Sequence, residues 1–414
     1  MEFSKAIFQV FDLKTVIYGV ILLFIVIDVF SSTSITKAPV TIPSNTISSP
    51  PLSLAIILKP SNTSIFSIPN LKNTTSFRKR PICDIFQGRW VVDDGRSRPS
   101  YRPGECPFIH FNFDCFKSGR MDLNYTMLRW KPNGCSLRRL TRHKMAKFLR
   151  GKRLAFVGDS LSRNEYQSFL CLLTNDAGKK KKVLVVRKTK VFEKFGFESA
   201  NFPDDNFTID FIQTPFLVQK FEGKVQLDVM AKVSEDYKNA DIIVFNSAHW
   251  WRHRITNHGN NFYQIGKHVY KHLTPKMAFK KSLRTWSKWV DANINATRTQ
   301  VFFRSFSPVH YSGGQWNSGG NCRGENFPIT KLKKRGKFEL QETLETALRK
   351  MSTPVRYLNV TTMSNYRKDA HPSIFRGKTI NETIQDCSHW CLPGVPDSWN
   401  ELLFTMLMDH GQQK

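Results

Sequence analysis

One stretch of the chain passes from a short apolar run to a polar turn and then to a helical repeat. Residues 153–157 (RLAFV) predict a buried strand, which Gly158 ends. Beyond this turn, apolar residues recur at steps of three and four, at Tyr166, Phe169, Leu170 and Leu173. That spacing places side chains on one face of a helix. The segment therefore predicts a strand, a tight turn and a helix in succession.

Two further apolar runs end in polar residues. Residues 240–245 (ADIIVF) lead into Asn246, and residues 300–303 (QVFF) lead into Arg304. The stretch 338–351 has a helical pattern. Buried strands that alternate with helices are typical of a parallel α/β sheet. We therefore expect a central parallel sheet flanked by helices, with polar side chains gathered at the carboxyl ends of the strands.

The N-terminal segment predicts a membrane anchor. Residues 16–30 (VIYGVILLFIVIDVF) are apolar apart from Asp28. With their uncharged flanks they predict a signal-anchor helix over residues 15–36 and a cytoplasmic tail over residues 1–14. A signal peptide cleaved near Ser31 is the alternative.

The composition changes twice after this segment. Residues 37–76 are rich in Ser, Thr, Pro and Asn, which is typical of a flexible stem. From Cys83 onward, aromatic, Gly and Cys residues reach the density of a packed domain. We expect one folded domain over residues 77–411.

The formal net charge is +29, from 62 Lys and Arg against 33 Asp and Glu. Such an excess favours polyanionic partners, which include nucleic acid, anionic lipid and acidic polysaccharide. A lysine run at residues 179–182 adds to it. The chain carries no zinc-finger spacing, RNP string or basic zipper, which usually accompany nucleic-acid binding. We therefore expect no nucleic-acid partner.

The eight cysteines all follow residue 80, and none belongs to a CxxC pair. An even set in a chain with an apolar N-terminal segment favours disulfides in an oxidising compartment over free cytosolic thiols. Spacing alone leaves 105 pairings open. Sequons of the form Asn-x-Ser/Thr support secretion in combination with the cysteines. They start at Asn62, Asn73, Asn124, Asn206, Asn295, Asn359 and Asn381.

Two short strings supply candidate chemistry. The first, Gly-Asp-Ser at residues 158–160, follows the strand at 153–157, and the second, Asp-Cys-Ser-His at residues 386–389, lies near the C-terminus. A serine after a strand can act as a nucleophile, and an Asp can orient a nearby His as its base. Each string is weak alone, because a Gly-Asp-Ser tripeptide is usually a surface turn and an isolated His is more often structural or exposed. Together they predict a triad of Ser160, His389 and Asp386.

Further strings make the chain resemble the plant trichome birefringence-like proteins, a family of cell-wall polysaccharide O-acetyltransferases. The resemblance runs from about Cys83 to Met408. It is carried in order by Cys83-Asp84-Ile85-Phe86, Phe113-Asp114-Cys115, Arg129-Trp130, residues 158–164 (GDSLSRN), Asn246 with His249-Trp250-Trp251, Gly313-Gly314 with Trp316, and residues 386–394 (DCSHWCLPG).

The resemblance implies the fold of the GDSL/SGNH hydrolases, a central parallel sheet flanked by helices, with a smaller irregular lobe. It makes Ser160 the nucleophile, His389 the general base and Asp386 the residue that orients it. Trp250, Trp251 and Trp316 are candidates for holding a glycan, with packing beneath the site as the alternative. The residues expected around the oxyanion and the substrate are Gly158, Asp159, Arg163, Asn164, Asn246, His249, Trp250 and Trp316.

The implied reaction is a transfer in two steps. An acetyl donor of unknown identity acylates Ser160, and a hydroxyl of xylan, xyloglucan or pectin then attacks the acyl-serine. No bound cofactor and no metal is expected. The implied location is the Golgi membrane, as a single-pass type II protein with a luminal catalytic domain; a secreted protein is the alternative. A carbohydrate acetyl esterase and a non-catalytic protein that binds pectin and maintains its esterification are the rival functions.

The resemblance also implies four disulfides: Cys83–Cys135, Cys106–Cys171, Cys115–Cys391 and Cys322–Cys387. The last two would tie the segment of Asp386 and His389 to the rest of the domain. Three stretches depart from the family pattern: residues 137–140 (LRRL), residues 369–372 (DAHP) and the lysine run at 179–182. We expect none of the three to touch the triad.

Overall fold

The computed structural model describes residues 83–93, 101–137, 140–174, 183–189, 196–252, 255–315, 318–332, 338–377 and 384–411. The expected tail, anchor and stem at residues 1–76, the lysine run at 179–182 and Trp316 lie outside these ranges. Within them, no helix has both the length and the apolar character needed to cross a membrane.

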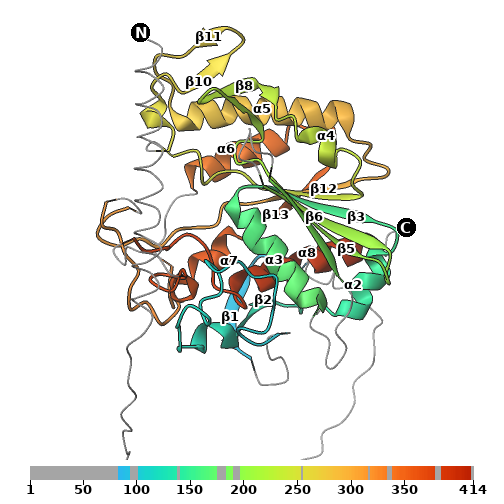
Figure 1. Ribbon diagram of the computed structural model, residues 1–414, viewed down its shortest axis with the longest axis vertical. Helices are drawn as coiled ribbons and strands as arrows, with labels where there is room; N and C mark the ends of the chain where they lie inside the picture. Colours follow the sequence, from blue (N-terminus) through green and yellow to red (C-terminus); the bar gives the residue numbers. More distant parts are fainter. Residues whose placement is uncertain are drawn as a thin grey trace, which may run out of the picture. The chain divides into compact units, whose positions relative to one another are not determined.

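A seven-stranded sheet forms the centre of the described domain, in the order β13-β12-β9-β3-β6-β5-β4 (Figure 1). The five strands from β13 to β6 run parallel. They are β3 (Arg153–Gly158), β6 (Phe207–Gln213), β9 (Ile242–Phe245), β12 (Gln300–Arg304) and β13 (Val355–Leu358). Three of them, β3, β9 and β12, coincide with the predicted apolar runs.

The prediction of a parallel sheet is wrong at one edge. There β5 (Gly196–Phe202) pairs antiparallel with β6, and β4 (Leu184–Thr189) pairs antiparallel with β5. Residues 203–206 join β5 to β6 as a tight turn. A short turn can join only antiparallel neighbours, because a parallel pair needs a long crossover. Asn206 has a φ of 52° in this turn, a conformation that Asn tolerates well.

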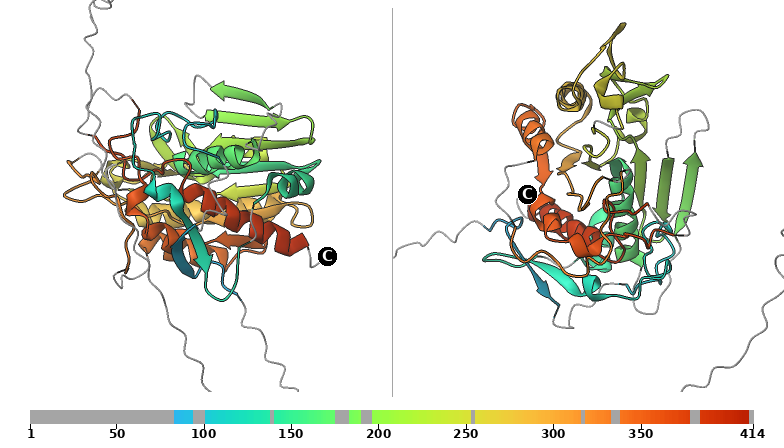
Figure 2. Two further views of the ribbon diagram at one scale, coloured as in Figure 1. Left: turned by 90° about the horizontal axis from the view of Figure 1, so that it is seen from below. Right: turned by 90° about the vertical axis from the view of Figure 1, so that its left-hand side faces the viewer.

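Helices cover both faces of the sheet (Figures 1 and 2). One face carries α2 (Arg142–Leu149), α3 (Ser160–Thr174) and α8 (Val395–Gly411), and the other carries α5 (Pro275–Asn293) and α6 (Glu339–Leu348). Side chains of β3 alternate between these layers: Phe156 joins the α3 and α8 core, whereas Val157 joins the α5 core. A strand buried on both faces reads as a continuous apolar run.

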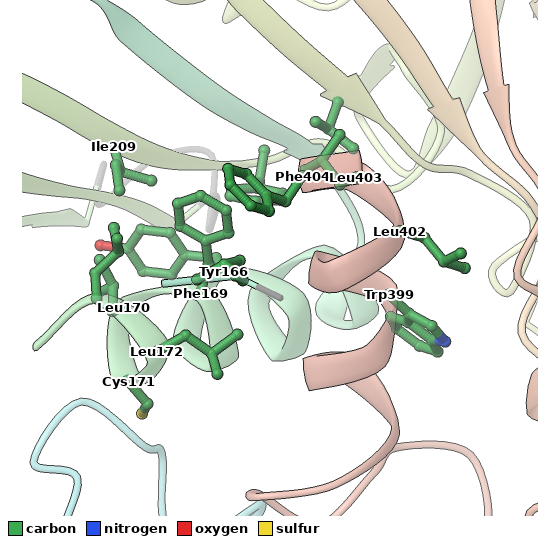
Figure 3. Close-up of a cluster of buried hydrophobic side chains, with 14 of the residues drawn as sticks. Tyr166, Phe169, Leu170, Cys171, Leu172, Ile209, Trp399, Leu402, Leu403 and Phe404 are labelled. Carbon is green, nitrogen blue, oxygen red and sulfur yellow. The ribbon is translucent and has the colours of Figure 1, made fainter. Parts of the chain in front are cut away.

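Helices α3 and α8 pack against each other and against the sheet, as Figure 3 shows. Tyr166 and Phe169 of α3 are buried beside Leu403 and Phe404 of α8. The rings of Phe156 and Phe169 meet edge to face with centroids 5.6 Å apart. This packing holds the first turn of α3 at the carboxyl end of β3.

Smaller elements surround this core. Strands β7 (Val218–Phe221), β8 (Lys224–Met230), β10 (Tyr263–Ile265) and β11 (His268–Val269) form a second sheet, in which β8 packs against α5. β1 (Gly88–Val92) and β2 (Leu128–Pro132) form a two-stranded sheet. The remaining helices of the described residues are α4 (Ser234–Tyr237), α7 (Thr361–Asn365) and three 3₁₀ turns at Asn124–Met127, Asn257–Gly259 and Lys368–Ala370.

Candidate active site

Ser160 begins α3 directly after β3, and its neighbours hold the turn between the two elements. The backbone N–H of Leu161 donates to the Asp159 carboxylate at 2.9 Å, and the N–H of Asp159 donates to Oδ1 of Asn246 at 3.3 Å. A Cβ at Gly158 would lie 2.3 Å from the backbone oxygen of Asn246, so only glycine fits this close approach. Gly158, Asp159 and Asn246 thus shape the turn that presents Ser160.

Asp386 and His389 lie on the loop that precedes α8. Oδ1 of Asp386 accepts hydrogen bonds from the backbone N–H groups of Ser388 at 3.1 Å and His389 at 3.0 Å. Its Oδ2 accepts a hydrogen bond from Nδ1 of His389 at 2.7 Å. The spacing of three residues is therefore accommodated by an Asx-type turn.

The two loops bring together residues that are 229 positions apart, because Nε2 of His389 lies 2.7 Å from Oγ of Ser160. Burial disfavours the carboxylate of Asp386, but the charge and hydrogen bonds of His389 outweigh it and hold the pKa of Asp386 below its usual range. Burial also disfavours the imidazolium, but Asp386 outweighs it and raises the pKa of His389. With Nδ1 protonated toward Asp386, Nε2 can accept the Ser160 proton.

Disulfides anchor the His389 loop on both sides. Cys387 pairs with Cys322 and Cys391 with Cys115, with Cα atoms 5.9 Å and 5.5 Å apart. Cys83–Cys135 and Cys106–Cys171 are also present. All four pairs are those that the resemblance implied.

Two of the expected site residues point elsewhere. The side chain of Asn164 is buried and clamps the backbone of Trp390, accepting from its N–H at 2.9 Å and donating to its carbonyl at 3.1 Å. Arg163 lies over the ring of Phe211 at 5.0 Å, with its Nε 3.6 Å from a carboxylate oxygen of Glu198. Asn164 thus positions the residue after His389, and neither side chain lines the cleft described below.

A cleft of about 310 Å³ opens beside Ser160 and His389. Its walls combine apolar, aromatic and cationic side chains. They are Ser160, Leu161, His249, Trp250, Arg252, Ile255, Tyr311, Arg376, Ile384, Gln385, Asp386, Ser388 and His389. Among the described residues, no three His, Cys, Asp or Glu side chains converge in a way that could hold a metal ion.

His249 lies between this cleft and the Ser160 turn. Its Nε2 donates to the backbone oxygen of Ser307 at 2.7 Å, and its Nδ1 lies 3.9 Å from Oδ2 of Asp159. Burial, together with the charges of Arg252 and Arg304, lowers the pKa of His249 well below its usual value. The ring is therefore neutral and buttresses the turn.

The neighbouring tryptophans differ in role. Trp250 is half-buried and lines the cleft, and its ring meets Phe216 edge to face at 5.9 Å. Trp251 is only 2% exposed, donates its indole N–H to Ser247 and stacks on Tyr263. Of the two, only Trp250 is available to a ligand, and Trp251 belongs to the packing beneath.

Several cleft residues were missed from the sequence, although their neighbours had been singled out. Arg252 follows the His-Trp-Trp string, Tyr311 precedes the Gly-Gly string and Arg376 follows the Asp-Ala-His-Pro string. The expectation that this last string avoids the triad is wrong. Nδ1 of His371 donates to the backbone oxygen of His389 at 2.6 Å, and its ring stacks on Trp390 at 4.1 Å.

Comparisons with known proteins cover nearly all of the folded chain. Residues 81–136 match the PMR5 N terminal domain, and residues 137–406 match the GDSL/SGNH-like acyl-esterase family found in Pmr5 and Cas1p.

Relatives in Arabidopsis thaliana are similar over the same region. Protein trichome birefringence-like 4 is 46% identical over 349 residues, which are 80% of this chain and 76% of that protein. Protein trichome birefringence is 45% identical over 343 residues, which are 79% of this chain and 56% of that protein. With its folded part matched almost from end to end and nearly half of the aligned positions identical, the chain belongs to the trichome birefringence-like family, within the GDSL/SGNH-like acyl-esterases.

Proposed function

We propose that the protein is an O-acetyltransferase that transfers acetyl groups to hydroxyls of a plant cell-wall polysaccharide through an acyl-serine. The observation that carries the proposal is the chain of contacts from Ser160 through His389 to Asp386, at 2.7 Å for each step, beside an open cleft. A serine hydroxyl is a poor nucleophile at neutral pH, and this geometry supplies the base that it needs.

In the first step, Oγ of Ser160 attacks the carbonyl carbon of the acetyl donor while Nε2 of His389 takes the hydroxyl proton. Collapse of the tetrahedral intermediate breaks the bond to the leaving group, which receives that proton from His389. Asp386 remains ionised and stabilises the transient imidazolium. Candidate donors to the oxyanion are the N–H of Ser160 at the positive end of α3 and Nδ2 of Asn246, which is buried without a hydrogen-bond partner.

In the second step, a sugar hydroxyl gives its proton to His389 and attacks the acetyl carbon of the acyl-serine. The acetyl ester moves to the sugar, and Ser160 regains its proton from His389. Trp250 provides a flat apolar surface at the cleft on which a sugar ring can pack. A carbohydrate esterase would use the same residues with water as the second nucleophile. A pectin-binding protein would need only the surface of the cleft and not the triad.

Incubation of the full chain with labelled acetyl donors and oligomers of xylan, xyloglucan, mannan and pectin separates these functions. We expect label in one class of oligomer, and its loss in Ser160→Ala but not in Ser287→Ala, a serine on α5 outside the cleft. Release of free acetate without labelled sugar would support the esterase. Oligomer binding with no turnover, unchanged by Ser160→Ala, would support the binding protein.

We also propose that the chain is held in the Golgi membrane by residues 15–36 as a type II protein and is glycosylated on its luminal side. The exposed sequon residues Asn124, Asn206 and Asn295 are accessible to such modification. The disulfides are compatible with an oxidising compartment. Sequencing the N-terminus of the mature protein distinguishes the anchored form, which retains residues 1–36, from a cleaved and secreted one.

A further inference from the structure

Two arginines face the cleft next to the proposed nucleophile. Arg252 comes from the loop after β9, and Arg376 from the loop before the segment of Asp386 and His389. Both are partly buried. Their charges act on the site, because Arg376 opposes protonation of His389 and Arg252 favours ionisation of Asp159 in the Ser160 turn. Two positive charges therefore stand where a substrate must enter.

Neither guanidinium forms an ion pair with an acidic side chain in the part of the chain that the structure describes, although the charge of Asp159 acts on Arg252. Nε of Arg376 is buried and has no hydrogen-bond partner. Elsewhere in the domain buried arginines are paired, as Arg304 with Glu165 and Arg367 with Asp369, each at 2.9 Å. An unpaired, partly desolvated cation is costly unless something binds it. Arg129 and Arg356 are also partly buried without an ion pair in the described ranges. It is therefore the position of Arg252 and Arg376 on the wall of the cleft beside Ser160 that points to an anionic group supplied by a ligand.

We propose that Arg252 and Arg376 bind the carboxylate of a uronic acid in the acceptor glycan, so that the protein prefers acidic to neutral polysaccharide. The inference rests on the proposed function and names the acceptor class of that same site. A guanidinium presents a planar fork that matches a carboxylate in two-point contact. Beside it, the half-buried Trp250 and the exposed Ile384 offer an apolar surface to the sugar ring. The excess of 29 positive charges would further concentrate a polyanion near the surface.

A phosphate on the acetyl donor is the other source of an anion. Arginine binds phosphate as well as carboxylate, but the described lining of the cleft contains no lysine and no glycine, the residues that supply the point charge and the backbone N–H cradle of many phosphate sites. The acceptor carboxylate is therefore the source that we favour, and the experiments separate the two.

Binding is measured first, in full-length Ser160→Ala, which removes turnover. The ligands are an oligogalacturonide and the same oligomer with its carboxyl groups reduced to alcohols. We expect the acidic oligomer to bind more tightly, and Arg252→Gln or Arg376→Gln to weaken it about tenfold each while leaving the reduced oligomer nearly unchanged. Arg298→Gln, which removes an exposed arginine outside the cleft, is the matched control. Equal affinity for the two oligomers, or an equal loss in Arg298→Gln, would overturn the inference.

Transfer is then measured with two donors, 4-nitrophenyl acetate and acetyl-coenzyme A. We expect the two arginine variants to reduce the preference for the acidic acceptor to the same extent with either donor. A loss confined to acetyl-coenzyme A, with the acceptor preference intact, would assign the arginines to the donor phosphate and overturn the inference. Absence of an acyl-serine with both donors would refute the proposed function, while the binding measurement would still decide the role of the arginines.

Discussion

The hydrogen bonds between Asn164 and the backbone of Trp390 allow a test of whether Asn164 positions His389 or stabilises the oxyanion. The side chain of Asn164 is fully buried and makes two hydrogen bonds with the backbone of Trp390, the residue that follows His389. Asn164→Ala removes both bonds, at about 1 kcal/mol each, and leaves a buried N–H and a buried carbonyl without partners. We expect it to lower the free energy of unfolding by ~2–5 kcal/mol and to reduce turnover as His389 loses its position.

Asn164→Asp refines this prediction. At neutral pH its carboxylate would keep the bond from the Trp390 N–H but would set an unprotonated oxygen against the Trp390 carbonyl. Burial favours the protonated acid, which can both accept and donate as the amide does. The folded-state pKa of the new carboxyl is therefore raised, so its stabilising interactions are present at low pH and are lost as pH rises through that pKa. We expect the stability gap to the wild type to narrow as the pH falls.

Urea denaturation over a range of pH gives the stabilities, and acetyl transfer at saturating donor gives kcat. The sequence alone suggested that Asn164 stabilises the oxyanion. On that view, Asn164→Ala would reduce kcat steeply while leaving the unfolding free energy within about 0.5 kcal/mol of the wild type. Such a result would refute the role of these two hydrogen bonds in stabilising the fold and positioning His389.

Other predictions concern the proposed triad and its supports. Asp386→Asn should lower kcat by roughly 10⁴-fold with little change in donor KM, because the amide no longer holds His389 in the required tautomer; an effect below tenfold would contradict the role. The rate of transfer should rise with pH through the pKa of His389, which lies above the ordinary 6.5 of histidine. The stability that comes from the contact of His389 with Asp386 should instead be full below about pH 6.5 and fall as the pH passes that raised pKa. A pH–rate profile tests the first expectation, and urea titrations over a range of pH test the second. Gly158→Ala should disrupt the turn, because its Cβ would meet the backbone of Asn246 at 2.3 Å, and circular dichroism with kcat would reveal it. Replacement of Cys322 and Cys387 by serine should lower both stability and activity; full retention of both would show that the disulfide does not hold the loop.

Three of the central strands, β3, β9 and β12, could be predicted because they are buried on both faces. The run before Gly158 is apolar at successive positions, and the residues after it return to one helix face. The edge strands lack such a pattern. β13 reads VRYL and carries Arg356 among its few positions, while only two of the seven residues of β5 are buried. Pairing with a neighbour, and not hydrophobicity, determines these strands.

The candidate site also divides into residues that the sequence predicts and residues that it does not. Ser160, Asp386 and His389 could be predicted because their residue types and strings imply their chemistry. The partner of Asn164 is a backbone group 226 residues away, and that of His371 is the backbone of His389, which residue types cannot encode. Arg252 and Arg376 are two of 62 basic residues, and only the fold reveals that both line the cleft beside Ser160.

The long separation between Ser160 and His389 has a consequence for the newly made protein. The ribosome completes the strand and helix that carry Ser160 long before it reaches Asp386 and His389, near the end of the chain. Until that last segment emerges and Cys391 can join Cys115, the serine has no base beside it. On the proposed mechanism, a nascent or truncated chain that lacks Asp386 and His389 would not acylate Ser160, and the order of synthesis delays this reactivity until both residues have been made.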